Sequence, residues 1–85
     1  MAKYKILIKE SAAKELDIIP KKHLNHIIKK IQSLAEDARP HGVQKLSNQE
    51  RYRIRHGEYR IVYSIEDADL TVHIYRIGHR REVYR

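Results

Sequence analysis

Apolar and polar side chains alternate near the start of the chain and again through its second half. Residues 4–9 place Tyr or Ile at every second position, which predicts a short strand. The stretches 51–56 and 59–65 alternate in the same way, with Gly57-Glu58 as a tight turn between them, and a third strand is expected over 70–77 after a break at 66–69. The pattern therefore predicts a strand near the N-terminus and three consecutive antiparallel strands later.

Between these regions the apolar spacing changes to three and four residues, which is typical of helices. Ser11 is expected to cap a helix of about two turns, and Pro20 limits its length. A second helix is expected from Pro20, as a first-turn residue, to about Ala35. Its apolar stripe consists of Leu24, Ile27, Ile28, Ile31, Leu34 and Ala35. A polar connection then runs to about Gln49.

The predicted element order is βααβββ, which indicates an α+β fold. A helical hairpin on one face of a mainly antiparallel sheet of three or four strands buries both the helix stripe and one strand face. The other sheet face stays open, and a polar tail is expected from Gly78 to Arg85. With 85 residues and no linker or repeat, the chain is expected to form one domain over 1–85.

Charge gives the first indication of function. The chain has 18 Lys and Arg against 11 Asp and Glu, a net charge of +7, so its partner is expected to be an anion. Nucleic acid is the commonest such partner, although an acidic protein or a membrane surface is equally compatible with the net positive charge. Before residue 39 every cation is Lys, whereas from Arg39 onward the chain has nine Arg and a single Lys, Lys45. Because the arginine fork matches phosphate oxygens, the anion site is expected in the second half.

Composition also excludes several classes of protein. The absence of Cys excludes disulfides, a thiolate nucleophile and Cys-ligated zinc. No apolar run approaches the roughly 18 residues of a membrane span, and the N-terminus does not resemble a signal peptide, so a cytoplasmic location is expected. The six His show no metal-binding pattern; His23 and His26 are expected to be solvated on a helix, and His73 to pack within a strand. No metal and no cofactor are expected.

Arginines gather on one face of the predicted sheet. Arg51, Arg53 and Arg55 share a face, and Arg60 joins them whichever two-residue turn connects the strands. Like charges directly opposite on a sheet cost on the order of 0.2–1 kcal/mol. This arrangement indicates that a bound polyanion offsets the cost, and further cations follow at Arg80, Arg81 and Arg85. The alternative is a solvated face paired with Glu58 and Glu66.

All six aromatic residues of the chain are Tyr. Three of them, Tyr52, Tyr59 and Tyr63, alternate with Ile and are expected in or beside the core. Tyr84 instead lies among arginines, whose positive charge favours the phenolate, so it is a candidate general base; packing of the C-terminal tail is the alternative. His79 is the second choice for acid or base. Asp67 and Asp69 read as turn formers.

The segments YRIRHGEYRIVY (52–63) and IGHRREVYR (77–85), with weaker support from ARPHGVQKL (38–46), resemble the RelE/ParE toxin superfamily, and the RelE branch more than the ParE branch. The resemblance covers the whole chain in length and element order. It implies a fold similar to microbial ribonucleases and an endonuclease that cuts mRNA in the A site of the 70S ribosome. It also implies a cognate antitoxin that binds the toxin in a hetero-oligomer.

The resemblance assigns roles only where residues match. It gives a basic pair at Arg53 and Arg55, an arginine at Arg60, another at Arg80 or Arg81, and a tyrosine at Tyr84. The best-known members carry lysines at the first pair. Since arginine stays protonated in proteins, Arg53 and Arg55 are expected to bind phosphate and not to act as bases.

The implied reaction needs no protein nucleophile. Tyr84, or else His79, takes the proton of a 2′-hydroxyl, which attacks its own 3′-phosphate while Arg60 and Arg80 stabilise the charge on the phosphoryl oxygens. Three other functions remain open: a ParE-like gyrase poison, a non-catalytic nucleic-acid-binding module, and an inactive family member that binds a partner.

Overall fold

The computed structural model describes residues 3–46 and 50–79. Within these ranges the order of elements is β1 (Lys5–Ile8), α1 (Glu10–Asp17), α2 (Lys21–Ser33), β2 (Gln44–Lys45), β3 (Tyr52–His56), β4 (Tyr59–Glu66) and β5 (Thr71–His79). Neither described helix has the length and apolar composition of a membrane-spanning segment. The predicted α+β class and the order βααβββ are confirmed, with the short strand β2 as an addition.

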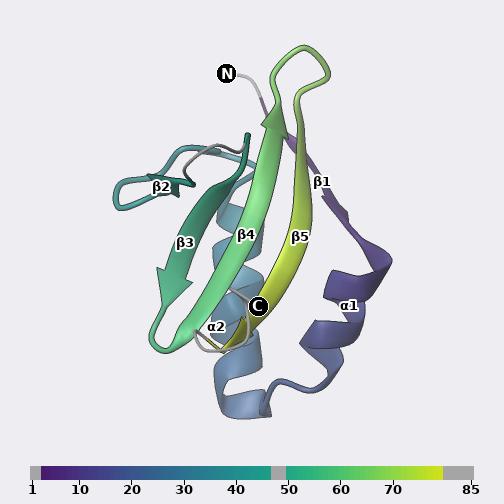
Figure 1. Ribbon diagram of the computed structural model, residues 1–85, viewed down its shortest axis with the longest axis vertical. Coiled ribbons are helices and arrows are strands. Elements are labelled where there is room, and N and C mark those ends of the chain that lie inside the picture. Colours follow the sequence, from purple (N-terminus) through teal and green to yellow (C-terminus); the bar gives the residue numbers. More distant parts are fainter. Residues whose placement is uncertain (1–2, 47–49, 80–85) are drawn as a thin grey trace.

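The strands form one sheet in the order β1-β5-β4-β3-β2 (Figure 1). The meander β3-β4-β5 is antiparallel as predicted, whereas β1 pairs with β5 in parallel. The sheet has five strands and not three or four because β2, only two residues long, pairs with the start of β3. So short a strand has no alternation that a sequence pattern could reveal.

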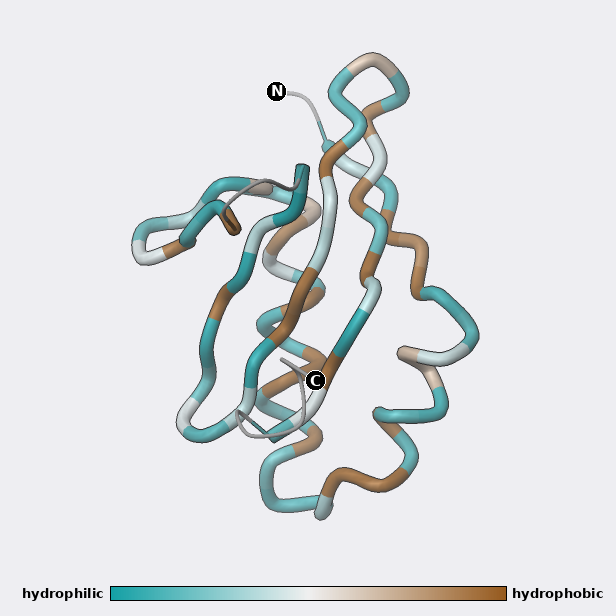
Figure 2. The backbone as a smooth tube through the Cα atoms, in the orientation of Figure 1, coloured by the Kyte–Doolittle hydropathy of each residue, from teal (hydrophilic) through white to brown (hydrophobic). Residues whose placement is uncertain are grey.

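The helices cover one face of the sheet, and the core lies between them. α2 crosses behind the strands, and α1 lies beside β5 and below β1 (Figure 1). Ile27 and Ile31 of α2 are buried against inward residues of the meander such as Ile54 and Ile61. Figure 2 shows hydrophobic segments recurring along α2 and along the central strands. The predicted helix stripe is confirmed apart from Ile28, which is 36% exposed.

Tyr63 is the largest fully buried side chain of the core. Its hydroxyl donates a hydrogen bond of 2.8 Å to the carbonyl oxygen of Ala38, which satisfies the polar end of the ring inside the protein. Burial raises the pKa of this phenol, because ionisation would place a charge in an apolar site. The prediction that tyrosines alternating with Ile belong to the core is confirmed here.

Three element boundaries differ from the sequence prediction. α1 begins at Glu10 with Lys9 as its N-cap and no side-chain cap, so Ser11 lies inside the helix and does not cap it. Pro20 is the N-cap of α2 and not a residue of its first turn. β5 continues to His79, because Gly78 and His79 pair with the start of β4; the predicted tail therefore begins too early.

The turn between β4 and β5 is fastened to two other segments. Asp67 accepts a 2.6 Å hydrogen bond from the Tyr4 hydroxyl and two hydrogen bonds from the guanidinium of Arg39, at 2.9 and 3.3 Å. These bonds, the Arg39 pair first, lower the pKa of Asp67. Asp67 was predicted as a turn former, and it also joins the start of β1 to the loop after α2.

Candidate nucleic-acid interface

The open face of the sheet carries the predicted arginines. Because directly paired residues share a face, the register places Arg55 directly opposite Arg60, and Arg53 opposite Val62. The turn at Gly57-Glu58 fixes this register, and Gly57 adopts the positive φ of 59° that such a turn requires. The structure thus brings three predicted phosphate-binding residues together on two adjacent strands.

A third strand adds a residue that sequence reasoning missed. Val62 pairs with Arg53 on one side and with Arg76 of β5 on the other. Val62 is only 4% exposed, yet it does not belong to the core cluster on the helix side. The alkyl stems of long cationic side chains cover apolar surface in this way. We define the arginine face as Arg51, Arg53, Arg55, Arg60 and Arg76.

A β-bulge explains why Arg76 could not be placed from the sequence. Tyr63 pairs with Ile74 and Val62 with Arg76, which leaves Tyr75 as an extra residue on β5. Val72, Ile74 and Ile77 are all buried in the core. Before the bulge the even-numbered residues of β5 face the core, and after it the odd-numbered residues do. The two consecutive residues Tyr75 and Arg76 therefore both lie on the open side, whereas strict alternation would separate them.

Glu15 of α1 holds Arg76 at the edge of the sheet. One carboxylate oxygen of Glu15 accepts a 3.1 Å hydrogen bond from Nε of Arg76, and the other accepts a 2.9 Å bond from the backbone N–H of Ile77. β1 pairs only with Thr71–Ile74, so at Ile77 the edge of β5 is satisfied by this side chain instead of by a strand. Sequence reasoning gave Glu15 no role.

Gly78 is the partner of Arg60 on the adjacent strand. The two residues are directly paired on β5 and β4, so a side chain at position 78 would stand next to Arg60 on the open face. With glycine there, β5 itself places no side chain next to Arg60 at that point.

The predicted candidate His79 lies on the other side of the same strand. It pairs with Tyr59, whose ring contacts His23 of α2 at 5.2 Å between centroids. Its own ring lies edge-on to Tyr59 at 6.1 Å, and its Nε2 is 4.0 Å from Oε2 of Glu58. His79 and Tyr59 line a pocket of about 290 Å³ together with Glu15 of α1 and with Ile18 and Ile19, which follow that helix. The structure thus places His79 on the helix side and not among the arginines.

The helix histidines also contact the hairpin instead of being merely solvated. His26 stacks on His56 at 5.2 Å between ring centroids with an interplanar angle of 16°. His73 lies in β5 as predicted, on the open face beside Tyr75. Over the described ranges no three His, Asp or Glu side chains converge as metal ligands.

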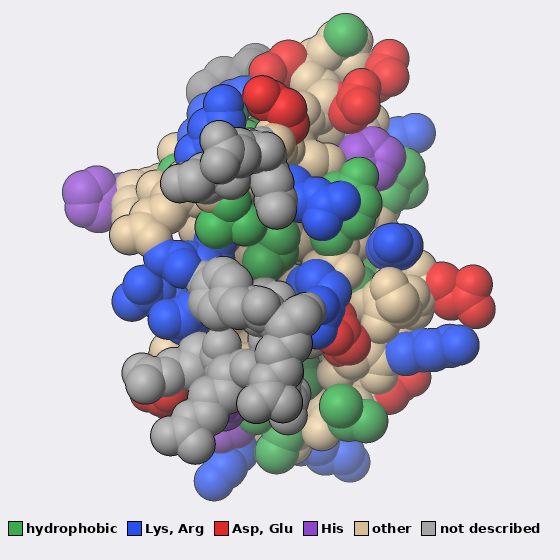
Figure 3. Space-filling view, in the orientation of Figure 1, with side chains coloured by type: hydrophobic (Ala, Val, Ile, Leu, Met, Phe, Trp, Pro, Cys, Tyr) green, Lys and Arg blue, Asp and Glu red, His purple; other side chains and the backbone are tan. Residues whose placement is uncertain are grey.

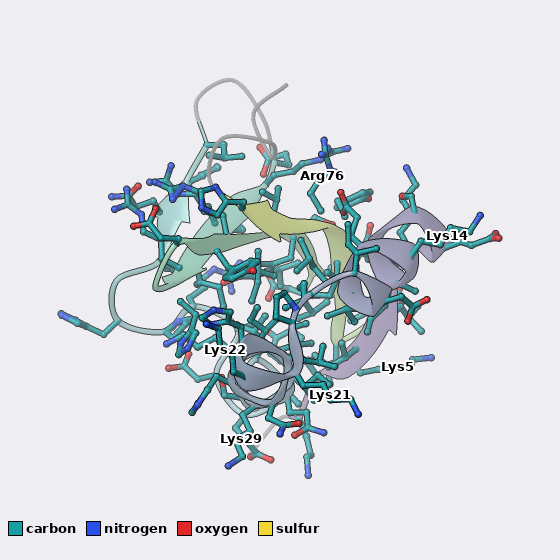
Figure 4. The ribbon with its side chains drawn as sticks, turned by 90° about the horizontal axis from the view of Figure 1, so that it is seen from below. Lys5, Lys14, Lys21, Lys22, Lys29 and Arg76 are labelled. Carbon is teal, nitrogen blue, oxygen red and sulfur yellow. The ribbon has the colours of Figure 1, made fainter. Side chains whose placement is uncertain are left out.

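Figure 3 views the open face. Lys and Arg side chains gather across its middle, and acidic side chains lie at the end formed by the β4–β5 turn. Figure 4 shows Arg76 on this side of the sheet, and Lys21, Lys22 and Lys29 of α2 on the other side. The open face is therefore a cationic surface on a rigid sheet, suited to a polyanion.

Comparison with known proteins identifies the family. The family described as "ParE toxin of type II toxin-antitoxin system, parDE" matches residues 6–84. The chain belongs to the RelE/ParE toxin superfamily. It is thus a toxin of a type II toxin–antitoxin system. Comparison with curated protein sequences gives no match.

Solved structures of RelE toxins share the fold of this toxin. A chain of the RelBE2 toxin–antitoxin complex from Mycobacterium tuberculosis is 25% identical with a TM-score of 0.84, covering 96% of this chain and 97% of that one. A chain of the archaeal RelE–RelB complex from Pyrococcus horikoshii OT3 is 27% identical with a TM-score of 0.82, covering 96% and 99%. The isolated E. coli RelE toxin is 26% identical with a TM-score of 0.80, covering 95% and 90%.

Some predicted site residues of this toxin follow the end of β5. Arg80, Arg81, Tyr84 and Arg85 lie outside the described residues. Their predicted roles stay predictions. The described part of the site consists of the arginine face, which the sequence predicted at four positions of five, and of Tyr75, Glu15 and Gly78, which it did not assign.

Proposed function

We propose that this toxin is an endoribonuclease that cleaves mRNA in the A site of the ribosome and thereby inhibits translation. The arginine face is the observation that carries the proposal. Arg55 lies directly opposite Arg60, and two residues further along β4 Val62 is flanked by Arg53 on one side and Arg76 on the other. Like charges so close together favour an anionic ligand, because binding it relieves their repulsion. The likeness to RelE structures over nearly the whole chain supports RNA as that ligand.

The chemistry follows from the 2′-hydroxyl of RNA. The 2′-oxygen forms a bond to the adjacent phosphorus, the bond from phosphorus to the 5′-oxygen breaks, and the products are a 2′,3′-cyclic phosphate and a 5′-hydroxyl. A base takes the proton of the 2′-hydroxyl, and an acid returns one to the 5′-oxygen. No metal or cofactor enters this scheme.

Arginines supply most of the rate enhancement in this scheme. Arg60 and Arg80 donate to the phosphoryl oxygens as negative charge develops there, and Arg53 and Arg55 hold the flanking backbone. Gly78, which is paired with Arg60, adds no side chain of β5 that would compete with a phosphate bound to Arg60. Tyr84 is proposed as the base. His79 is the weaker candidate, because its ring lies against Tyr59 on the helix side.

A cognate antitoxin is proposed as the protein partner. Several solved relatives are toxin–antitoxin complexes, among them RelBE2 from M. tuberculosis and RelE–RelB from P. horikoshii. For this toxin, an acidic amphipathic segment that covers or distorts the arginine face would prevent it from binding RNA. A hetero-oligomer of toxin and antitoxin is the expected storage form.

The test is cleavage of a defined end-labelled mRNA in a purified translation system, with and without ribosomes. Primer extension is expected to map cuts to the A-site codon only when ribosomes are present. A 2′-deoxy nucleotide at the mapped site should abolish cleavage, and Tyr84→Phe should reduce it without loss of folding. Absence of cuts with a folded, antitoxin-free toxin would rule the proposal out.

Gyrase poisoning is the second candidate, because the matching family is described as a ParE toxin. It predicts inhibition of DNA supercoiling by purified gyrase, with no dependence on Tyr84. The two assays separate the candidates, since the RNA reaction requires a 2′-hydroxyl and gyrase inhibition does not.

A further inference from the structure

The open face has a second region, above the arginine pairs, that the proposed chemistry does not use. It is formed by Tyr75 and His73 of β5 and by Arg51, the residue before β3. The guanidinium carbon of Arg51 lies 4.0 Å from the centroid of the Tyr75 ring, which is stacking distance. The His73 ring is 6.5 Å from the same centroid, tilted by 36°.

The bulge is what exposes this ring. Tyr75 is the extra residue of β5, and a regular strand would have left either Tyr75 or Arg76 on the core side. The core on the helix side is filled without it, since Tyr75 is not among the buried residues or those packed against them. Tyr75 is half-buried on the open face, with Nζ of Lys9 at 5.7 Å from its centroid.

The stack lies next to the proposed site of phosphate binding. Arg51 precedes Arg53 by two residues, about 7 Å along the chain direction. Tyr75 directly precedes Arg76, which shares the row of Arg53 and Val62. An RNA strand whose phosphate contacts this row would therefore place a neighbouring base within reach of the stack.

We propose that Arg51 and Tyr75 form a stacking platform for a nucleobase next to the cleaved phosphate. This inference rests on the proposed RNA-cleaving function. Single-stranded RNA is bound in this way, with unstacked bases on aromatic rings or on the plane of an arginine. Tyr75 backs the Arg51 plane and holds it parallel to an incoming base, while Lys9 and Arg51 draw in the backbone. The platform recognises a planar base and not a particular sequence.

The experiment measures binding to ribosomes whose A-site codon carries 2′-O-methyl groups, so that the RNA stays intact. Fluorescently labelled toxin is titrated against this mRNA and against versions with one abasic nucleotide at each position in and beside the codon. For the wild-type toxin, one abasic position is expected to weaken binding roughly 5- to 150-fold, the range for losing one base stack.

Two variants remove the platform in different ways. Tyr75→Leu keeps an apolar side chain but no ring; it should bind intact mRNA as weakly as the wild type binds the abasic mRNA, and the abasic position should have no further effect. Tyr75→Phe should restore the discrimination. Arg51→Lys keeps the positive charge but loses the planar guanidinium, so it should also fail to discriminate between intact and abasic mRNA. This variant tests the platform even if Tyr75→Leu does not fold.

The outcomes separate this inference from the proposed function. If the wild type binds but Tyr75→Leu and Arg51→Lys discriminate abasic mRNA as well as it does, the platform is overturned and the nuclease proposal stands. If Tyr75→Leu only lowers the melting temperature, the stack is structural, and the platform is likewise overturned. If the wild type neither binds nor cleaves, both proposals fall.

Discussion

The two sides of the sheet carry positive charge in different forms (Figure 4). The open side has arginines on strands, and three of them, Arg53, Arg60 and Arg76, are half-buried at positions fixed by pairing register. The helix side has lysines on α2, and Lys21, Lys22 and Lys29 are exposed. Net charge alone does not distinguish these surfaces, but geometry does.

The difference indicates a division of work. A guanidinium held in place loses little freedom when it binds a phosphate, so the open side is suited to a reaction that needs donors at defined positions. A lysine on a flexible stem acts as a hydrated point charge that attracts any polyanion over a distance. We therefore expect the arginine face to determine cleavage, and the lysine side to affect mainly the rate of association.

The largest effect is expected from Arg60→Ala. Loss of one donor to the phosphoryl oxygens should reduce the single-turnover rate of A-site cleavage by roughly 10²–10³-fold. The matched control is Lys22→Ala, which removes one cation from the helix side and should change the rate less than a few-fold. Equal losses in the two variants would mean that net charge, and not the placement of Arg60, controls cleavage.

The next effect concerns how Arg76 is held. Glu15→Ala removes the acceptor of the Ile77 N–H and the hydrogen bond between Glu15 and Nε of Arg76, which should destabilise the fold by about 1–3 kcal/mol. Glu15→Gln keeps an oxygen acceptor, so its loss should be smaller. Urea unfolding measures both.

Cleavage assays on the same variants show whether Glu15 positions the arginine. Glu15→Gln should lower the cleavage rate while most of the stability is kept, because the ion pair between Arg76 and Glu15 is lost and the acceptor oxygen for Ile77 remains. If the urea midpoint shifts but the cleavage rate does not change, the role of Glu15 is only structural, namely to attach α1 to β5.

Periodicity predicted the elements and most of the arginine face. Strand alternation is a local property, so the positions of Arg51, Arg53, Arg55 and Arg60 follow from spacing once the Gly57-Glu58 turn fixes the register. The core role of Tyr63 follows in the same way.

What could not be predicted depends on contacts between distant segments. The bulge that turns Tyr75 to the open side reverses the alternation at one point, and its only mark in 70–77 is Arg76 where alternation expects an apolar residue, followed by Ile77. Glu15 and Arg76 are 61 positions apart. His79 was placed with the arginines because the strand was expected to end earlier; pairing with Tyr59 carries it to the helix side.

A smaller effect is expected from the lysine side. Replacing Lys21, Lys22 and Lys29 by Gln should slow association with ribosomes a few-fold at low salt, because long-range attraction to RNA weakens. At about 1 M salt, where the screening length is about 3 Å, the variant and the wild type should associate equally fast. Stopped-flow fluorescence measures the rates; a difference that persists at high salt would indicate direct contacts of these lysines.

The smallest effect concerns Arg39, an arginine that belongs to neither surface. Its guanidinium is bound to Asp67, so Arg39→Gln should lower the urea midpoint slightly and leave A-site cleavage unchanged. The dependence on pH has a definite sign. Hydrogen bonds from Arg39 and Tyr4 hold the pKa of Asp67 below its usual 3.8, so the stabilisation is present above pH 3.8 and is lost as the pH falls through the lower value of the folded protein.

Asp67→Asn is the matched variant for this test, because it removes the titrating group at the other end of the pair. Its urea midpoint should be lower than that of the wild type at pH 7, and the gap should close as the pH falls below 3.8. A gap that stays constant down to pH 2 would show that the carboxylate charge contributes nothing to stability.

The cleavage assay on Arg39→Gln tests the contrast between the two sides of the sheet. If this variant loses as much cleavage as Arg60→Ala, arginines act here through total charge. The placement of charge on the two sides would then have no effect on catalysis.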